Sequence, residues 1–156
     1  MSENTSPKRN EPLLFEVQLN LLPDQRGILT ANDVKGVIHI SVPPEFGGPE
    51  NNWSPEHLFL CSISSCFMTT FQFFSKGLEI QDFKAEVIGK VERIQGQYEF
   101  TQVDLYPIIY IADERNMDET KTALDKAQKY CLVSHSVKCQ IIYHSQVLLA
   151  KKSIDL

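Results

Sequence analysis

Apolar and polar side chains alternate along residues 13–21. Strict alternation of this kind predicts a β-strand with one buried face. Turn-forming residues occupy 23–27, and the segments 28–31 and 37–42 predict two further strands after that turn. The N-terminal part of the chain is therefore expected to supply three strands ahead of the first helix.

A long helix is predicted between Ser54 and Gly77. Ser54 and Pro55 are typical of a helix start, Glu56 suits the positive end of the helix dipole, and Gly77 is typical of a helix end. Apolar residues occur on nearly all sides of this segment, which indicates a helix buried on more than one face. A single domain of this size offers little cover for such a helix, so a second subunit is its simplest source.

Two long strands, 83–94 and 97–111, are predicted to pair through a hairpin turn at Gln95 and Gly96. Proline has no backbone N–H to donate to a neighbouring strand. Pro107 therefore favours an edge position or a bulge for the second of these strands.

A helix at 118–131 and a final strand at 137–147 complete the pattern. The element order βββ-α-ββ-α-β does not alternate regularly, which predicts an α+β fold with antiparallel sheet and a long buried central helix. We expect one domain over residues 13–150. A disordered lead-in at 1–12 and a tail at 151–156 are expected to flank it.

The chain has 156 residues and a net charge of −5. An acidic chain does not provide the basic surface by which proteins bind nucleic acids or anionic membranes. No apolar run is long enough to predict a membrane-spanning helix, and the N-terminus resembles no secretory signal. We expect a soluble cytoplasmic protein, in which the four cysteines stay mostly reduced.

Cys66 lies midway along the predicted central helix. Taken alone, it is best explained as a small buried apolar residue. Nearby hydroxyl groups give this part of the helix a polar patch. These hydroxyls can donate to a thiolate or to backbone carbonyls one turn back. They belong to Ser62, Ser64, Ser65, Thr69 and Thr70.

Cys131 closes the second predicted helix, where the negative end of the dipole disfavours a thiolate. It is therefore a poorer nucleophile candidate than Cys66 and a better partner for resolving an oxidised thiol. Cys61 lies about 140° around the helix from Cys66. Cys139 shares a strand face with apolar residues. We expect both Cys61 and Cys139 to be structural.

A metal site is a weaker alternative. His57 and Cys61 are four residues apart, and so are Cys131 and His135. Two such pairs could supply a tetrahedral Cys2His2 zinc site, although the spacing matches no compact zinc motif.

Several segments together resemble the OsmC/Ohr family, the osmotically inducible and organic hydroperoxide resistance proteins. PPEFGG leading into NWSPEHLFLCSISSCF is similar to the family's loop and central-helix start. AQKYCLVSHSVK is similar to its second cysteine motif, and PDQRG stands where the family places an arginine. The resemblance extends over about residues 13–147.

This resemblance implies a thiol-dependent peroxidase that reduces organic hydroperoxides on an intertwined homodimer, with no cofactor and no metal. Cys66 matches the peroxidatic cysteine and Cys131 the resolving cysteine, which an external dithiol resets. Arg26 and Glu56 match the charged pair that tunes the first thiol. The alternative is a non-catalytic ligand-binding or redox-sensing member of the family. Aromatic residues are candidates to line an apolar channel for the peroxide, namely Trp53, Phe59, Phe67 and Phe71.

Two features of the sequence qualify this carry-over. Leu132 follows Cys131, where a proline commonly stands in the peroxidase branch. Glu56 and Cys66 are ten residues apart on one helix, about 15 Å along its axis. A glutamate side chain does not span that distance. Glu56 would therefore act on the Cys66 of the other subunit.

Overall fold

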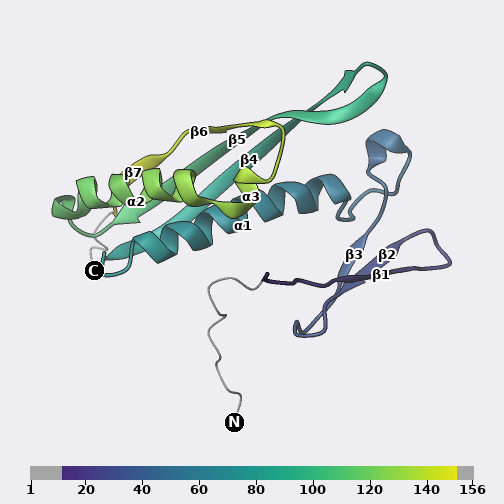
Figure 1. Ribbon diagram of the computed structural model, residues 1–156, viewed down its shortest axis with the longest axis horizontal. Coiled ribbons are helices and arrows are strands. Elements are labelled where there is room, and N and C mark those ends of the chain that lie inside the picture. The colour runs from purple at the N-terminus through teal and green to yellow at the C-terminus, as the bar shows by residue number, and fades with distance from the viewer. Residues whose placement is uncertain (1–11, 151–156) are drawn as a thin grey trace, which may run out of the picture. The chain divides into compact units, whose positions relative to one another are not determined.

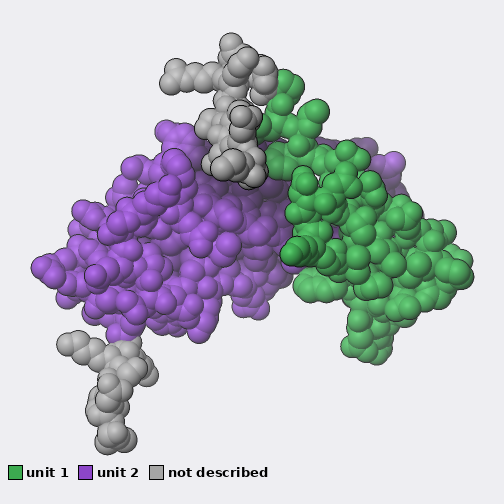
Figure 2. Space-filling model, turned by 90° about the horizontal axis from the view of Figure 1, so that it is seen from below, with its two compact units in different colours: residues 1–56 green, residues 57–156 purple. Residues whose placement is uncertain are grey.

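The computed structural model describes residues 12–150, which belong to two compact units. The first unit ends at Glu56 and the second begins at His57 (Figure 2). Residues 1–11 and 151–156 lie outside the described part of the chain. Most of the predicted lead-in and the whole predicted tail fall there.

The first unit contains a three-stranded antiparallel sheet of β1 (Gln18–Leu21), β2 (Gly27–Thr30) and β3 (Ile38–Ile40), with β2 in the middle (Figure 1). Its first connection is a tight turn in which the Leu22 N–H donates to the Arg26 carbonyl over 2.7 Å. The prediction of three strands ahead of the first helix is confirmed.

The prediction of a half-buried first strand was wrong in two respects. Only the end of the segment 13–21 forms a strand, and its apolar side chains are exposed. Three short strands carry no second layer that could cover this face. The exposed fractions are 92% for Phe15, 72% for Val17, 62% for Leu19 and 73% for Leu21.

The second unit packs helices on one face of a mixed sheet (Figure 1). Its helices and strands, in chain order, are α1 (Pro55–Phe74, which begins at the end of the first unit), β4 (Ile80–Ile94), β5 (Gln97–Ile111), α2 (Met117–Tyr130), α3 (Leu132–His135), β6 (Gln140–Tyr143) and β7 (Gln146–Leu149). The α+β fold class with a long central helix is confirmed.

The antiparallel pair β4–β5 is the largest feature of this sheet. Its turn has Gln95 at φ 49° and Gly96 at φ 90°. Positive φ at both central residues suits the twist of a two-residue hairpin. The predicted hairpin is therefore confirmed.

The predicted final strand at 137–147 is instead two short strands, β6 and β7. Both pair parallel with β5, one after the other along the same edge. The break between them lies opposite Tyr106 and Pro107, which pair with neither strand. Because proline offers no N–H there, a continuous partner strand would lack a hydrogen bond at this point.

The prediction that Pro107 marks an edge or a bulge was also wrong. β5 is central, since β4 pairs on one side and β6 and β7 on the other. The register shifts of the β4–β5 pair fall between Ile80 and Asp82 and between Lys90 and Val91. Pro107 is fully buried and pairs opposite Ala85.

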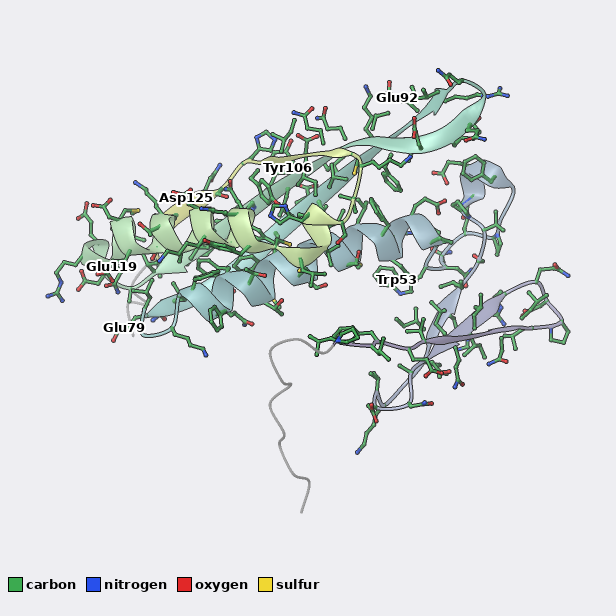
Figure 3. The ribbon with its side chains drawn as sticks, viewed as in Figure 1. Trp53, Glu79, Glu92, Tyr106, Glu119 and Asp125 are labelled. Atoms are coloured by element: carbon green, nitrogen blue, oxygen red, sulfur yellow. The ribbon has the colours of Figure 1, made fainter. Side chains whose placement is uncertain are left out.

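One face of β5 forms the core of the second unit with α1 and α2. Glu119 and Asp125 of α2 are exposed, as the side chains in Figure 3 illustrate, while its opposite stripe is buried. Burial of this apolar set is the main driving force for folding of the unit. The buried cluster is Phe67, Phe71, Leu105, Ile109, Ile111, Ala123, Leu124, Ala127 and Cys131.

Only one stripe of α1 is buried, consisting of Ile63, Phe67 and Phe71. Other apolar side chains of the helix remain accessible, and Phe73 is 61% exposed. By length and composition alone α1 would also pass for a membrane-spanning helix. Its stripe at four-residue spacing packs into the cluster around β5, so we identify it as a core helix.

Candidate active site

Cys131 lies at the junction of two helices. α2 ends at Tyr130, Cys131 is extended with φ −66° and ψ 109°, and α3 begins at Leu132. The predicted helix over 118–131 therefore ends one residue early. Cys131 is completely buried, with 0% of its surface exposed.

Two hydroxyl groups form a hydrogen-bonded chain that ends on this sulfur. Ser134 Oγ in α3 donates to Cys131 Sγ at 3.1 Å, and the Tyr143 hydroxyl in β6 donates to Ser134 Oγ at 3.0 Å. The Tyr143 ring also packs against Phe67, with ring centroids 5.2 Å apart. The thiol is therefore held by side chains from three elements of the second unit.

The structure brings Cys66 and Cys131 together. Cys66 is half-buried on α1 and packs against the cluster that contains Cys131. The two thiols lie close enough to interact. A negative charge on Cys66 disfavours a negative charge on Cys131, and this raises the pKa of Cys131. Residues 65 positions apart in the chain thus form one dithiol site.

The electrostatics of this site disfavour ionisation of Cys131. Burial is the largest cause that raises the pKa of the Cys131 thiol, and Cys66 raises it further. Hydrogen bonds from Ser134 act in the opposite direction without reversing the shift. Burial also raises the pKa of Tyr143. Cys131 and Tyr143 therefore keep their protons at neutral pH.

The hydroxyl groups around Cys66 do not donate to its thiol. Thr69 and Thr70 both donate to the Cys66 carbonyl, at 3.1 and 2.8 Å. Ser62 and Ser65 likewise donate to carbonyls one turn back. The sequence allowed these hydroxyls to donate either to a thiolate or to backbone carbonyls. In the structure they donate to backbone carbonyls. These bonds satisfy the hydroxyls of an otherwise apolar helix.

Arg26 and Glu56 belong to the first unit, and they form no ion pair with each other within residues 12–150. Arg26 instead pairs with Asp24, with 2.6 Å between nitrogen and oxygen. The guanidinium holds the pKa of Asp24 below its usual value, and Asp24 raises the pKa of Arg26. The expected Arg26–Glu56 contact is replaced by this local pair because two residues of one turn meet readily.

Glu56 contributes to an apolar cavity of about 460 Å³ in the first unit. Its Oε2 atom is buried and has no hydrogen-bond partner among the described residues. A buried carboxylate oxygen without a partner is costly. The side chains around it include Leu19, Leu21, Ile40 and Phe46.

The remaining cysteines were expected to be structural, with Cys139 on an apolar strand face. Cys61 is exposed, and Cys139 is half-buried in a bend just before β6 rather than within a strand. Burial raises the pKa of Cys139. Within residues 12–150, no group of three or more His, Cys, Asp or Glu side chains is placed to hold a metal ion. The zinc alternative therefore gains no support.

The residues expected to line an apolar channel have different surroundings. Phe67 and Phe71 are core residues with at most 1% of their surface exposed. Phe59 stacks on Phe100 at 4.5 Å between ring centroids. Trp53 belongs to the first unit and is 52% exposed.

Sequence reasoning missed Ser134 and Tyr143. The spacing of Cys131 and Ser134 was an available signal, because residues three apart lie on the same side of a helical turn. Tyr143 had no such signal. Its contact with Ser134 depends on how β6 pairs with β5.

Comparisons with known proteins agree with this fold. The family model described as OsmC-like protein matches residues 48–144, more than half of the chain. The chain therefore belongs to the OsmC-like family, and the resemblance seen in the sequence is confirmed. It is also 22% identical over 129 residues to the uncharacterized protein YmaD of Bacillus subtilis (strain 168), which covers 80% of this chain and 86% of YmaD.

Solved structures show the same fold at low sequence identity. An OsmC-like protein of unknown function from Vibrio cholerae superposes with a TM-score of 0.75 at 15% identity, covering 86% of this chain and 99% of that one. An organic hydroperoxide resistance protein from Elizabethkingia anophelis gives 0.69 at 16% identity, covering 90% and 99%. Likeness at such identities establishes the shared fold alone.

Proposed function

We propose that this protein is a thiol-dependent peroxidase that reduces organic hydroperoxides through Cys66 and Cys131. The observation that carries the proposal is the pairing of a half-buried thiol on α1 with a fully buried thiol that a hydroxyl group holds in place. Membership of the OsmC-like family and a fold shared with an organic hydroperoxide resistance protein support it.

The unequal burial of the two thiols supports different roles for them in this proposal. The attacking species in peroxide reduction is a thiolate. Cys66 is the more accessible thiol, whereas burial raises the pKa of Cys131. Cys66 is therefore the peroxidatic cysteine and Cys131 the resolving cysteine.

In the first step, the Cys66 thiolate attacks the outer oxygen of the hydroperoxide. The O–O bond breaks, an S–O bond forms, and the alkoxide takes a proton and leaves as an alcohol. Cys66 is oxidised to a sulfenic acid.

In the second step, Cys131 attacks the sulfur of that sulfenic acid. A disulfide forms, the S–O bond breaks, and the Cys131 proton leaves with the hydroxyl group as water. An external dithiol then reduces the disulfide by thiol–disulfide exchange. No cofactor or metal enters this cycle.

The proposal includes a homodimer. The first unit exposes the apolar face of β1, and α1 buries only one stripe of its surface. A second copy of the chain would cover such surfaces, and obligate dimers bury more than about 2,000 Å². In this dimer, Arg26 and Glu56 of one copy would reach the Cys66 of the other, where the guanidinium stabilises the thiolate.

A cytoplasmic location, with neither nucleic acid nor membrane as a partner, belongs to the same proposal. The net charge of −5 supports it, because a basic surface is the usual footprint of both partners. A reducing compartment would also supply the dithiol that the cycle consumes.

The proposal is tested by following cumene hydroperoxide consumption with dithiothreitol as reductant. We expect many turnovers per chain with the wild type and none with Cys66→Ser. A protein that forms one disulfide per chain but consumes no further peroxide with excess dithiol would instead be a redox sensor.

A further inference from the structure

The hydroxyl groups of Tyr143 and Ser134 are hydrogen-bonded in series, and both bonds run toward the Cys131 sulfur. We propose that Ser134 and Tyr143 are positioning residues of the resolving step, holding Cys131 toward Cys66 and stabilising the negative charge that the Cys131 sulfur develops. This inference rests on the proposed function, because it assigns the resolving role to Cys131.

The geometry ties these hydroxyls to both thiols. Cys131 and Ser134 are three residues apart across the start of α3, and Tyr143 reaches Ser134 from the end of β6. The Tyr143 ring is held in turn by Phe67, which directly follows Cys66 on α1. The hydroxyl pair is therefore linked to Cys131 by a hydrogen bond and to α1, which carries Cys66, by a ring contact.

The direction of the two hydrogen bonds matters. A buried sulfur gains a negative charge only against the cost of desolvation. A donor already aimed at the sulfur offsets part of that cost, and Tyr143 strengthens it by donating to the same Ser134 oxygen. Ser134 accordingly opposes the effect of burial on the pKa of Cys131.

The titratable groups nearest the Cys131 sulfur interact with one another. Cys66 on α1 raises the pKa of Cys131, and the charges of Cys131 and Cys66 both raise the pKa of Tyr143 on β6. His135, adjacent to Ser134, places its Nε2 atom 2.6 Å from the Lys129 carbonyl instead.

Ser134 keeps its own proton throughout the cycle. As Cys131 attacks the sulfenic acid, its thiol proton passes to the sulfenic hydroxyl group, so negative charge develops on the sulfur while the S–S bond forms, the S–O bond breaks and water leaves. When the dithiol attacks the Cys66 sulfur, Cys131 departs as a thiolate and later takes a proton from the second dithiol group. In both steps Ser134 donates to a Cys131 sulfur that carries negative charge.

The test uses the full chain with Cys61→Ser and Cys139→Ser, so that the dithiol is the only thiol pair. The Cys66–Cys131 disulfide is formed with diamide, which requires no peroxidase activity, and its rate is measured against pH. Ser134→Ala should slow this rate about tenfold near neutral pH and move the pH profile upward. Tyr143→Phe, which keeps the ring, should give a smaller loss.

Two further variants separate positioning from folding. Ser134→Thr restores a hydroxyl and should recover most of the rate. The Ser136 hydroxyl lies in the same turn and donates to the Leu132 carbonyl at 2.9 Å. Its removal in Ser136→Ala should leave the rate and the pH profile unchanged. An equal loss in Ser136→Ala, or no loss in Ser134→Ala, would overturn the inference.

The same variants distinguish failure of the inference from failure of the proposed function. With Cys131 also replaced by serine, so that the sulfenic acid is not resolved, dimedone trapping of the Cys66 sulfenic acid after cumene hydroperoxide should proceed equally with and without Ser134→Ala. If no sulfenic acid forms in either protein while Ser134→Ala still slows the diamide reaction, the peroxidase proposal fails and the positioning role stands.

Discussion

The two units of the chain differ in how they use their apolar residues. The second unit turns one face of β5 onto α1 and α2 and buries a continuous cluster that includes Cys131. The first unit has three short strands and leaves the apolar face of β1 exposed. Alternation of apolar and polar residues therefore identifies a strand face suited to burial. It does not identify the element or subunit that buries this face.

The difference extends to chemistry. Both thiols of the proposed cycle lie in the second unit, whereas Arg26 and Glu56 lie in the first. Glu56 has a buried oxygen without a hydrogen-bond partner in residues 12–150, and Arg26 is bound to Asp24 in the same turn. The second unit contains both thiols, and the charged groups that the resemblance assigns to the site belong to the first.

The largest expected effect concerns the dithiol. Cys66→Ser should abolish peroxide reduction, because a hydroxyl does not replace a thiolate as the nucleophile. Cys131→Ser should allow one turnover and then stall with the sulfenic acid on Cys66. Peroxide consumption per chain, measured in single-turnover and steady-state experiments, checks both variants. Dimedone bound to Cys131 rather than Cys66 in the wild type would reverse the assignment.

The next effect concerns the core of the second unit. Leu105→Ala should destabilise the protein by about 2–5 kcal/mol, because Leu105 is fully buried and the substitution leaves a cavity. Chemical denaturation measures the loss. The control is Leu148→Ala, at a residue of the same sheet that is 41% exposed. This substitution should lower the free energy of unfolding by less than Leu105→Ala does. Equal losses would contradict the packing described for β5.

The third effect addresses the exposed face of the first unit. Leu21 is 73% exposed, so Leu21→Asp in an isolated chain should change stability by no more than about 0.5 kcal/mol. If a second copy covers this face, the variant should instead shift from dimer to monomer in analytical ultracentrifugation. Asn20→Asp, on the same strand, is the matched control and should not. A wild type that sediments as a folded monomer at micromolar concentration would rule out the dimer.

A smaller effect is expected at Arg26. If it acts on Cys66 in the dimer, Arg26→Met should disfavour the thiolate form of Cys66, because a nearby positive charge is lost. Peroxide attack should slow at neutral pH and recover partly in alkali. The alkylation rate of Cys66 against pH, with the other cysteines replaced by serine, measures this. An unchanged curve would leave Arg26 as a turn residue paired with Asp24.

The smallest effect is a test of local electrostatics in the second unit. Arg115 lowers the pKa of Asp113 from 3.8 to about 2. A depressed carboxyl pKa contributes stability that is present above the unfolded value and is lost as pH falls through the folded value. The wild type should therefore lose this contribution between about pH 4 and pH 2, and Asp113→Asn should not show it. Acid unfolding curves of the two proteins would coincide if the pair contributes nothing.

Sequence reasoning was most accurate where local patterns decide the structure. The hairpin at Gln95 and Gly96 and the strand 97–111 follow from turn chemistry and alternation, and both are confirmed. The break of the final strand into β6 and β7 was missed, because it depends on lying opposite Pro107 in a neighbouring strand.

The same limit applies to the candidate site. The neighbouring positions of Cys66 and Cys131 agree with the resemblance to the family, although their roles stay predictions. Ser134 and Tyr143 were not identified, because their contact requires α3 and β6 to meet. The Arg26–Glu56 contact was expected from the resemblance, but the nearest carboxylate in the turn, Asp24, takes the guanidinium.

We propose that Cys66 and Cys131 form one redox-active pair within a chain. The most direct test treats the reduced protein with one equivalent of cumene hydroperoxide, blocks the free thiols and maps disulfides by mass spectrometry under non-reducing conditions. We expect an intrachain Cys66–Cys131 disulfide, with Cys61 and Cys139 recovered as blocked thiols. A disulfide that uses Cys61 or Cys139, or four unoxidised cysteines, would contradict it.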